Sequence, residues 1–180
     1  KTLGGVPFYY VELSSINRPT WGEFRNSQRQ MMTEIFNCGM AVSSDLGHPT
    51  DVHPKNKKQV GERLARWALA KDYGFDIVFS GPLYQEMKIL DNEIEVSFQH
   101  CAEGLKSSGG GKLKGFEIAG TDGNFVKAVP KIQKNCVILS HSSINNPKLV
   151  RYGWQPFSNG NLVNSAGLPA STFITESTDY

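Results

Sequence analysis

The residues best suited to chemistry lie in one short polar stretch, DLGHPTDVH, at positions 45–53. A loop histidine such as His53 is suited to act as a general base, because a neutral imidazole titrates near physiological pH. A nearby carboxylate would fix its tautomer and stabilise the imidazolium that forms during attack. Asp51 lies two residues before His53 and is the first candidate for this acid, and Asp45 is the second. The alternative is a solvated turn that only connects two elements.

A metal site is a rival interpretation of the same loop, with His48, Asp51 and His53 as ligands. Zinc sites use histidine and carboxylate ligands, but three ligands within one such short loop would crowd. No cysteine pair lies nearby to complete the set. We therefore expect no metal. His100 and His141 fall in a part of the chain rich in strand signals, and we expect both to be structural or on the surface.

The elements that must position this loop alternate between strand and helix. Residues 6–13 (VPFYYVEL) have the pattern of a short buried strand, and the apolar spacing from Trp21 to Phe36 predicts a helix with Thr20 as its N-cap. A second strand is expected at 40–44, and a second helix from Pro54 to near Gly74. This order is typical of a parallel α/β sheet, in which ligands bind beyond the carboxyl ends of the strands. The loop follows such an end.

The composition changes near residue 80, and the rest of the chain is dominated by strand signals separated by turn residues. This pattern predicts a β-rich, sandwich-like domain over about 81–180, after an α/β portion over about 1–80. The expected strands are 76–80, 86–90, 93–98, 113–120, 125–132, 136–140 and 149–154. The segment SSGGGK at 107–112 lacks the spacing of a phosphate-binding loop and is expected to be a hairpin tip.

Composition excludes some classes of function. The chain of 180 residues has 19 basic and 17 acidic residues, mixed along its length, so no electrostatic footprint for nucleic acid is present. No apolar run approaches the roughly 20 residues that span a bilayer, so we expect no membrane span. The chain starts at Lys1 without a methionine, and we interpret it as a piece of something longer. Its three cysteines are widely spaced and are expected to be buried thiols, or one disulfide and a free thiol if the protein is exported: Cys38, Cys101 and Cys136.

Eight segments together resemble the carboxyl-terminal part of bacterial sialate O-acetylesterases, over about residues 6–175. The most specific are DVHPKNK and GLPAS, and the others are PFYYVEL, WGEFRNSQRQ, GMAVSSDLG, SGPLY, LKGFEIAG and VRYGW. That family is similar to the SGNH hydrolases, which are serine esterases with a flavodoxin-like three-layer α/β fold. The resemblance implies that residues 1–80 are the end of such a domain. It also implies removal of acetyl groups from sialic acid hydroxyls with no metal or organic cofactor.

The resemblance assigns the base to His53, which matches the family's late histidine, and the acid to Asp51, with Asp45 in reserve. Many SGNH hydrolases place the acid three residues before the histidine, where this sequence has Thr50. The family's nucleophile and oxyanion segments precede the region matched here. The serines that follow the expected strands lack the sharp glycine-flanked turn of a nucleophile: Ser14, Ser15, Ser43 and Ser44. The chain is thus expected to carry the base and acid without the serine.

A fragment of this kind needs a partner. We expect either the missing amino-terminal part of the same enzyme or a second copy that covers the open sheet edge. The resemblance implies an O-acetylated sialic acid or a related acetylated sugar as substrate, and a periplasmic or secreted location. The alternative is a non-catalytic carbohydrate-binding or interaction module, with the β-rich half as its functional part.

Two further pairs are candidates for substrate contacts. Arg25 and Gln28 share one face of the first expected helix, where an arginine could meet a sialic acid carboxylate. A purely structural role is the alternative for both. Trp154 and Phe157 could stack on a sugar ring or could pack under the GLPAS segment.

Overall fold

The computed structural model describes residues 5–175. In this range the α-helices are α1 (Trp21–Glu34) and α2 (Lys57–Lys71), and the short 3-10 turns are η1 (Ser44–Leu46) and η2 (Ser108–Gly110). The strands are β1 (Phe8–Val11), β2 (Cys38–Ala41), β3 (Leu83–Leu90), β4 (Glu93–Gln99), β5 (Leu105–Ser107), β6 (Phe116–Ala119), β7 (Val126–Lys127), β8 (Val129–Gln133), β9 (Cys136–Ser140), β10 (Leu149–Tyr152), β11 (Leu162–Asn164) and β12 (Phe173–Ile174).

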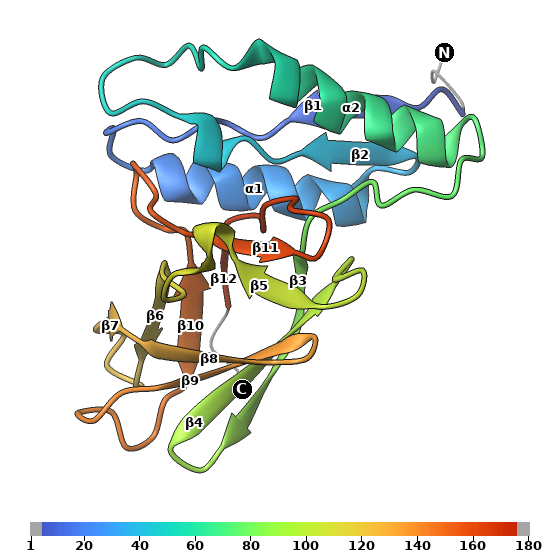
Figure 1. Ribbon diagram of the computed structural model, residues 1–180. Coiled ribbons are helices and arrows are strands. Elements are labelled where there is room, and N and C mark those ends of the chain that lie inside the picture. The colour runs from blue at the N-terminus through green and yellow to red at the C-terminus, as the bar shows by residue number, and fades with distance from the viewer. Residues whose placement is uncertain (1–4, 176–180) are drawn as a thin grey trace.

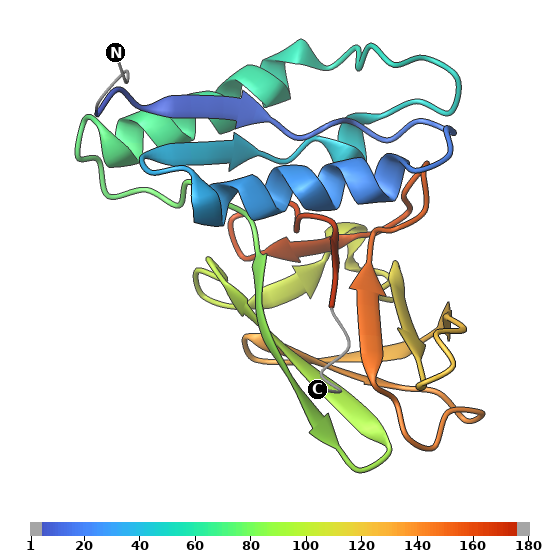
Figure 2. The same cartoon turned by 180° about the vertical axis from the view of Figure 1, so that it is seen from behind.

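The first part of the chain is a small layer of two strands and two helices. β1 and β2 pair in parallel, with Phe8 opposite Cys38 and Val11 opposite Ala41. α2 packs along this pair, and α1 lies between the pair and the rest of the molecule (Figures 1 and 2). The buried Trp67 of α2 fixes the packing, because its indole N–H donates a 3.0 Å hydrogen bond to the Met40 carbonyl.

The second part is β-rich and antiparallel. One four-stranded sheet has the order β3-β4-β9-β8, another has the order β12-β10-β6-β7, and β11 pairs with β5. In β4 every second side chain is buried, which is the periodicity of a strand with one face on a core. The sheets enclose one hydrophobic cluster made of Ile94, Val96, Phe98, Cys101, Leu105, Phe116, Ile118, Val137, Leu139, Val150, Tyr152, Leu162, Ala170 and Phe173.

The expected fold class was wrong. Among residues 5–175 the chain is mostly β-sheet, with two α-helices and one parallel pair, and it is not the end of an SGNH or flavodoxin-like three-layer α/β domain. The expected strand at 76–80 is not formed, because this segment pairs with no neighbouring strand and the Ile77 N–H bonds locally to the Phe75 carbonyl at 3.0 Å. The Val78 carbonyl accepts a hydrogen bond from Arg66 Nη1 at 2.8 Å. The division into parts at about residue 80 stays a prediction.

Two helix starts differ from expectation in their details. α1 begins at Trp21 as expected, but the Thr20 side chain makes no capping hydrogen bond and its backbone is left-handed, with φ 63°. α2 begins at Lys57 and not at Pro54, because Asn56 caps it. The Asn56 Oδ1 accepts the Gln59 backbone N–H at 3.1 Å. The loop after β2 is therefore longer than the sequence indicated.

The described residues also bear on two simpler expectations. None of the helices in residues 5–175 is long and apolar enough to cross a membrane. The three cysteines are free thiols: Cys101 is buried, and Cys38 and Cys136 are partly buried. Burial raises the pKa of Cys101 to about 11, so this thiol is inert at neutral pH.

Candidate functional site

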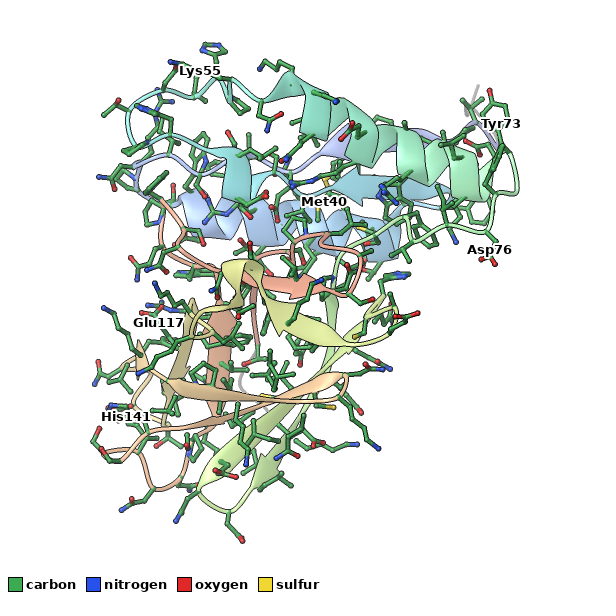
Figure 3. All side chains as sticks on the ribbon, in the orientation of Figure 1. Met40, Lys55, Tyr73, Asp76, Glu117 and His141 are labelled. Carbon is green, nitrogen blue, oxygen red and sulfur yellow. The ribbon has the colours of Figure 1, made fainter. Side chains whose placement is uncertain are left out.

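The loop that carries His53 is fastened to the segment that follows β1. The His48 backbone N–H donates to the Ser15 carbonyl at 3.0 Å, and the Asn17 N–H donates to the Pro49 carbonyl at 3.0 Å. Gly47 permits this approach, because a Cβ there would lie 2.0 Å from the Ser15 carbonyl oxygen. Lys55, just after His53, marks the loop in Figure 3, at the end of the molecule opposite Tyr73 and Asp76. The loop therefore has a defined place beyond the carboxyl ends of β1 and β2.

Asp51 and His53 form a carboxylate–imidazole pair within this loop. Asp51 Oδ1 accepts the His53 backbone N–H at 2.9 Å and lies 3.2 Å from His53 Nδ1. The hydrogen bond from the His53 N–H, with the side-chain bond, lowers the pKa of Asp51 and keeps it ionised. An ionised carboxylate at Nδ1 favours the tautomer with the proton on Nδ1, which leaves Nε2 as a proton acceptor. The His53 side chain is 83% exposed, so Nε2 is accessible.

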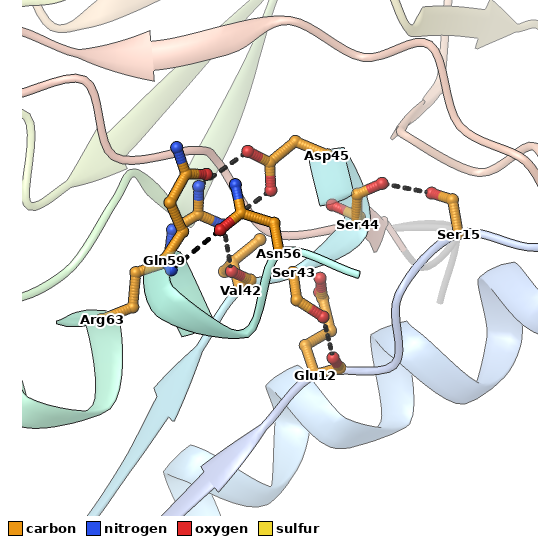
Figure 4. Close-up of polar contacts among 9 residues, drawn as sticks. All are labelled: Glu12, Ser15, Val42, Ser43, Ser44, Asp45, Asn56, Gln59 and Arg63. Carbon is orange, nitrogen blue, oxygen red and sulfur yellow. Dashed lines mark hydrogen bonds and ion pairs between the residues drawn. The ribbon is translucent and has the colours of Figure 1, made fainter. Parts of the chain in front are cut away.

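Asp45 has a different partner. Its two carboxylate oxygens accept hydrogen bonds from the two Arg63 nitrogens at 2.6 and 2.7 Å, and Arg63 Nη1 also donates to the Val42 carbonyl at 2.6 Å (Figure 4). This bidentate pair ties η1 to α2. Of the two candidate acids, Asp51 is the one that contacts His53, and Asp45 instead anchors the start of the loop.

Arg25 lies inside the protein and binds the carboxyl-terminal segments. Its side chain has no exposed surface. Its guanidinium donates to Thr172 Oγ1 at 2.9 Å, to the Gly153 and Gln155 carbonyls at 2.7 Å each, and to the Pro156 carbonyl at 3.0 Å. These bonds join α1 to the segment after β10. The predicted role of Arg25 in substrate binding has no open surface to support it in this structure.

Gln28 also binds backbone groups of the protein. Its Oε1 accepts the Leu13 N–H at 2.8 Å, and its Nε2 donates to the Val11 carbonyl at 3.3 Å. These bonds hold α1 against the end of β1. Gln28 and Arg25 share a helix face but serve different segments, and a contact of either with substrate stays a prediction.

Glu12 is a buried acid that sequence reasoning missed. It follows β1, has no exposed surface, and accepts the Thr172 N–H at 3.3 Å through Oε1, while Oε2 has no hydrogen-bond partner. Burial raises the pKa of Glu12 to about 7, against the opposing effects of the Arg25 charge and the Thr172 N–H. The only signal in the sequence was a glutamate at the end of the aromatic strand VPFYYVEL.

The serines near the loop are occupied by backbone contacts. The Ser15 and Ser43 hydroxyls are buried and donate to the carbonyls of Ser44 and Glu12, as Figure 4 shows. Ser14 is also buried, and its hydroxyl lies 3.5 Å from the Val52 carbonyl. Among the contacts of residues 5–175, no serine hydroxyl bonds to His53. In the same range, no three His, Cys, Asp or Glu side chains lie close enough to hold a metal ion.

A separate cleft opens on the β-rich part, beside β6 and the loop that follows β10. Its volume is about 640 Å³, and Trp154 and Phe157 both line it. Glu117, on β6 in Figure 3, also faces this cleft. The two aromatic residues noted in the sequence are thus brought together beside open space.

Comparison with known proteins places the chain near one class of enzyme. No protein-family model matches the chain, and no curated protein matches it. Among solved structures, the chain is similar to the crystal structure of a carbohydrate acetylesterase from Xanthomonas citri, with 35% sequence identity and a TM-score of 0.88. The similarity covers 94% of this chain and 41% of that chain, so the chain spans less than half the length of its relative. The expected relationship to carbohydrate esterases is confirmed at this level, and preference for sialic acid stays a prediction.

Proposed function

We propose that this chain is part of a carbohydrate O-acetylesterase and supplies its general base, His53, together with the acid that orients it, Asp51. The observation that carries the proposal is the 3.2 Å approach of Asp51 Oδ1 to His53 Nδ1 beneath an exposed imidazole. The similarity to a carbohydrate acetylesterase supports the class of reaction. The rest of the mechanism follows from what such a pair can do.

In this proposal a serine hydroxyl outside the described residues attacks the acetyl carbonyl. His53 Nε2 takes the serine proton as the Oγ–carbon bond forms, and Asp51 stabilises the imidazolium. The imidazolium then gives the proton to the sugar oxygen, the ester bond breaks, and an acetyl-serine remains. A water molecule repeats the sequence, with His53 as its base, and releases acetate and the free serine.

The serine and the oxyanion donors come from the amino-terminal part of the same enzyme or from a second copy of the chain. The relative is more than twice as long as the matched region, which leaves room for such a segment. Large apolar side chains are exposed around β1 and the end of α1, and they suit a contact of this kind: Val6, Phe8 and Phe36 are 63%, 50% and 89% exposed. Without this partner, we expect little esterase activity from the chain, because this proposal places the nucleophile and the oxyanion donors in the partner segment.

The narrower parts of the proposal rest on the sequence resemblance alone. They are an O-acetylated sialic acid as the substrate and a periplasmic or secreted location. Acetate release from acetylated sialic acid, compared with release from acetylated neutral sugars, decides the first of them.

The test of the proposal is acetate release by the protein at its natural length. We expect acetate from O-acetylated sugars, and we expect a serine-reactive phosphonate to modify one serine and stop the release. Activity that persists when the phosphonate is in excess would overturn the serine mechanism. Absence of acetate release from all O-acetylated sugars would overturn the esterase proposal.

The second candidate function is a non-catalytic carbohydrate-binding module. The cleft lined by Trp154 and Phe157 favours it, because aromatic rings beside polar groups suit a sugar. This candidate predicts saccharide binding that survives loss of both His53 and Asp51, with no acetate release at any chain length.

A further inference from the structure

We propose that the cleft between β6 and the loop after β10 binds an acidic saccharide, that is, a chain of pyranose rings that carry carboxylates. The cleft has a volume of about 640 Å³, enough for one or two sugar rings. The side chains that carry the argument are Lys114, Glu117, Lys127, Trp154, Gln155 and Phe157. The proposal rests on the proposed function only for the expectation that the ligand is a carbohydrate.

The aromatic wall of the cleft has one fixed ring and one open ring. Trp154 is fixed, since the Arg151 guanidinium lies 5.9 Å from its ring and α1 packs against it at Gly22. A Cβ at Gly22 would lie 2.3 Å from the Trp154 carbonyl oxygen, so only glycine allows this approach. Phe157 is 41% exposed and offers a free ring face. The apolar C–H face of a pyranose can stack on such a ring.

A polar group at the side of the cleft is held in place by the protein. Glu117 Oε2 accepts a 2.7 Å hydrogen bond from Arg151 Nε, and its Oε1 accepts a 3.3 Å bond from Gln155 Nε2. The Glu117 side chain is only 12% exposed. Arg151 therefore offsets its charge, and Gln155 is oriented with its amide at the cleft, where it can bond to sugar hydroxyls.

The remaining charges of the lining favour an anionic ligand. Lys114 and Lys127 are exposed, and neither forms an ion pair with another of the described residues. The one carboxylate of the lining, Glu117, is already paired with Arg151. The cleft thus presents two free ammonium groups, and a carboxylate on the ligand would be attracted to them. This charge balance is why we propose an acidic saccharide and not a neutral one.

The cleft lies at the same end of the molecule as His53. The segment after β1 contacts both regions: the Ile16 N–H donates to the Pro156 carbonyl at 3.3 Å, and the His48 N–H donates to the Ser15 carbonyl at 3.0 Å. In Figures 1 and 2 the loop before α2 and the loop after β10 lie on the same side of the molecule. A chain held in the cleft can therefore extend toward the His53 loop.

The test is calorimetric titration of the natural-length protein with an oligogalacturonate and with a neutral xylo-oligosaccharide of the same length, neither of which carries acetyl groups. We expect the oligogalacturonate to bind, the neutral oligomer to bind about fivefold more weakly, and added salt to reduce the difference. Phe157→Ala should weaken binding about tenfold, because it removes the open ring. The double variant Lys114→Gln/Lys127→Gln should abolish the preference for the acidic oligomer.

Matched controls use exposed residues outside the cleft, Phe75→Ala for the aromatic ring and Lys131→Gln for the charge. Both should bind as the unmodified chain does. No binding of either oligomer, equal binding of both, or unchanged binding by Phe157→Ala would overturn the inference. Saccharide binding in the cleft requires no catalytic serine. If the protein releases acetate but does not bind the oligogalacturonate, this inference is refuted and the proposed function is not. Binding in a protein that releases no acetate refutes only the proposed function.

Discussion

One carboxylate oxygen of Asp51 serves His53 twice: Oδ1 accepts the His53 backbone N–H at 2.9 Å and approaches the ring Nδ1 at 3.2 Å. The first contact shapes the turn and the second orients the ring. The acid and the base are therefore positioned relative to each other by their two-residue spacing, while the loop as a whole is held by the segment after β1. This arrangement separates what Asp51 does for the loop from what it does for the imidazole.

Asp51→Asn should lower kcat for acetate release while leaving the fold intact. The amide oxygen can still accept the His53 N–H, but the charge that stabilises the imidazolium is gone, so we expect a loss of about a thousandfold. The measurement is steady-state kinetics of the natural-length protein. Asp122→Asn is the matched control, because Asp122 Oδ1 accepts the Asn124 N–H at 3.2 Å in a similar exposed turn. Equal kinetics for the two variants would remove Asp51 from the mechanism.

Asp45 should matter for stability more than for chemistry. Its bidentate bonds to Arg63 predict a coupling free energy of about 1–2 kcal/mol in a double-mutant cycle with Asp45→Asn and Arg63→Met, followed by urea unfolding. The exposed pair Lys58 and Glu62, 3.8 Å apart on the same helix, is the control and should show no measurable coupling. A fall in kcat for Asp45→Asn as large as that for Asp51→Asn would contradict a purely structural role for Asp45.

Arg25 should be essential for stability. Arg25→Met removes a donor from the buried Gly153 carbonyl and from the part-buried carbonyl bonds of Gln155 and Pro156, and it removes the positive charge near Glu12. We expect the free energy of unfolding to fall by about 3–5 kcal/mol.

The measurement for Arg25 is urea unfolding followed by fluorescence. Arg25→Lys should restore little of the stability, because a single ammonium cannot replace the forked guanidinium. Arg18→Met, at an exposed position just before α1, is the control and should cost under 1 kcal/mol. If Arg25→Met lowered the free energy of unfolding by less than about 1 kcal/mol, the hydrogen bonds of Arg25 would contribute little to stability.

Glu12 should make stability depend on pH in an unusual direction. Its pKa is raised to about 7 in the folded protein from 4.5 in the unfolded chain, because burial disfavours the charged form. The folded state therefore binds the proton more tightly. The stabilising contribution of the protonated form is complete below about pH 4.5 and is lost as the pH rises through about 7.

Glu12→Gln tests this dependence, because it fixes a neutral side chain of the same shape. The Tm values of the variant and the unmodified protein should agree near pH 4, where Glu12 is protonated in both the folded and the unfolded state, and the variant should be the more stable one near pH 8. Glu34→Gln, at an exposed position on α1, is the control, and its Tm should change with pH in the same way as the Tm of the unmodified protein. Parallel curves for Glu12→Gln as well would show that Glu12 does not titrate in this range.

The sequence was most informative where structure is local. The order strand, helix, strand, helix in the first part follows from periodicity, and β4 and β9 lie where the apolar runs predicted them. The contact of Asp51 with His53 also follows from their spacing. The sequence did not predict which strands would be hydrogen-bonded neighbours in a sheet. One parallel pair was therefore mistaken for part of a larger α/β domain. The segment 76–80 has the composition of a strand but no neighbouring strand to pair with.

Contacts between distant parts of the chain were beyond sequence reasoning. Arg25 and Gln28 were assigned to one face and one role, but Arg25 bonds to Thr172, far along the chain, and Gln28 bonds to the end of β1. The cleft had a partial signal in Trp154 and Phe157. Glu117 and Gln155 join them only because β6 pairs with β10, with Glu117 opposite Arg151.

The most direct test of the account compares two histidines of the same loop. In the natural-length protein, acetate release from an O-acetylated sugar is measured for His53→Ala and for His48→Ala. Because His53 holds the carboxylate contact and His48 does not, we predict a loss of at least about a thousandfold for His53→Ala and little change for His48→Ala. An active His53→Ala protein would contradict the assignment of His53 as the general base.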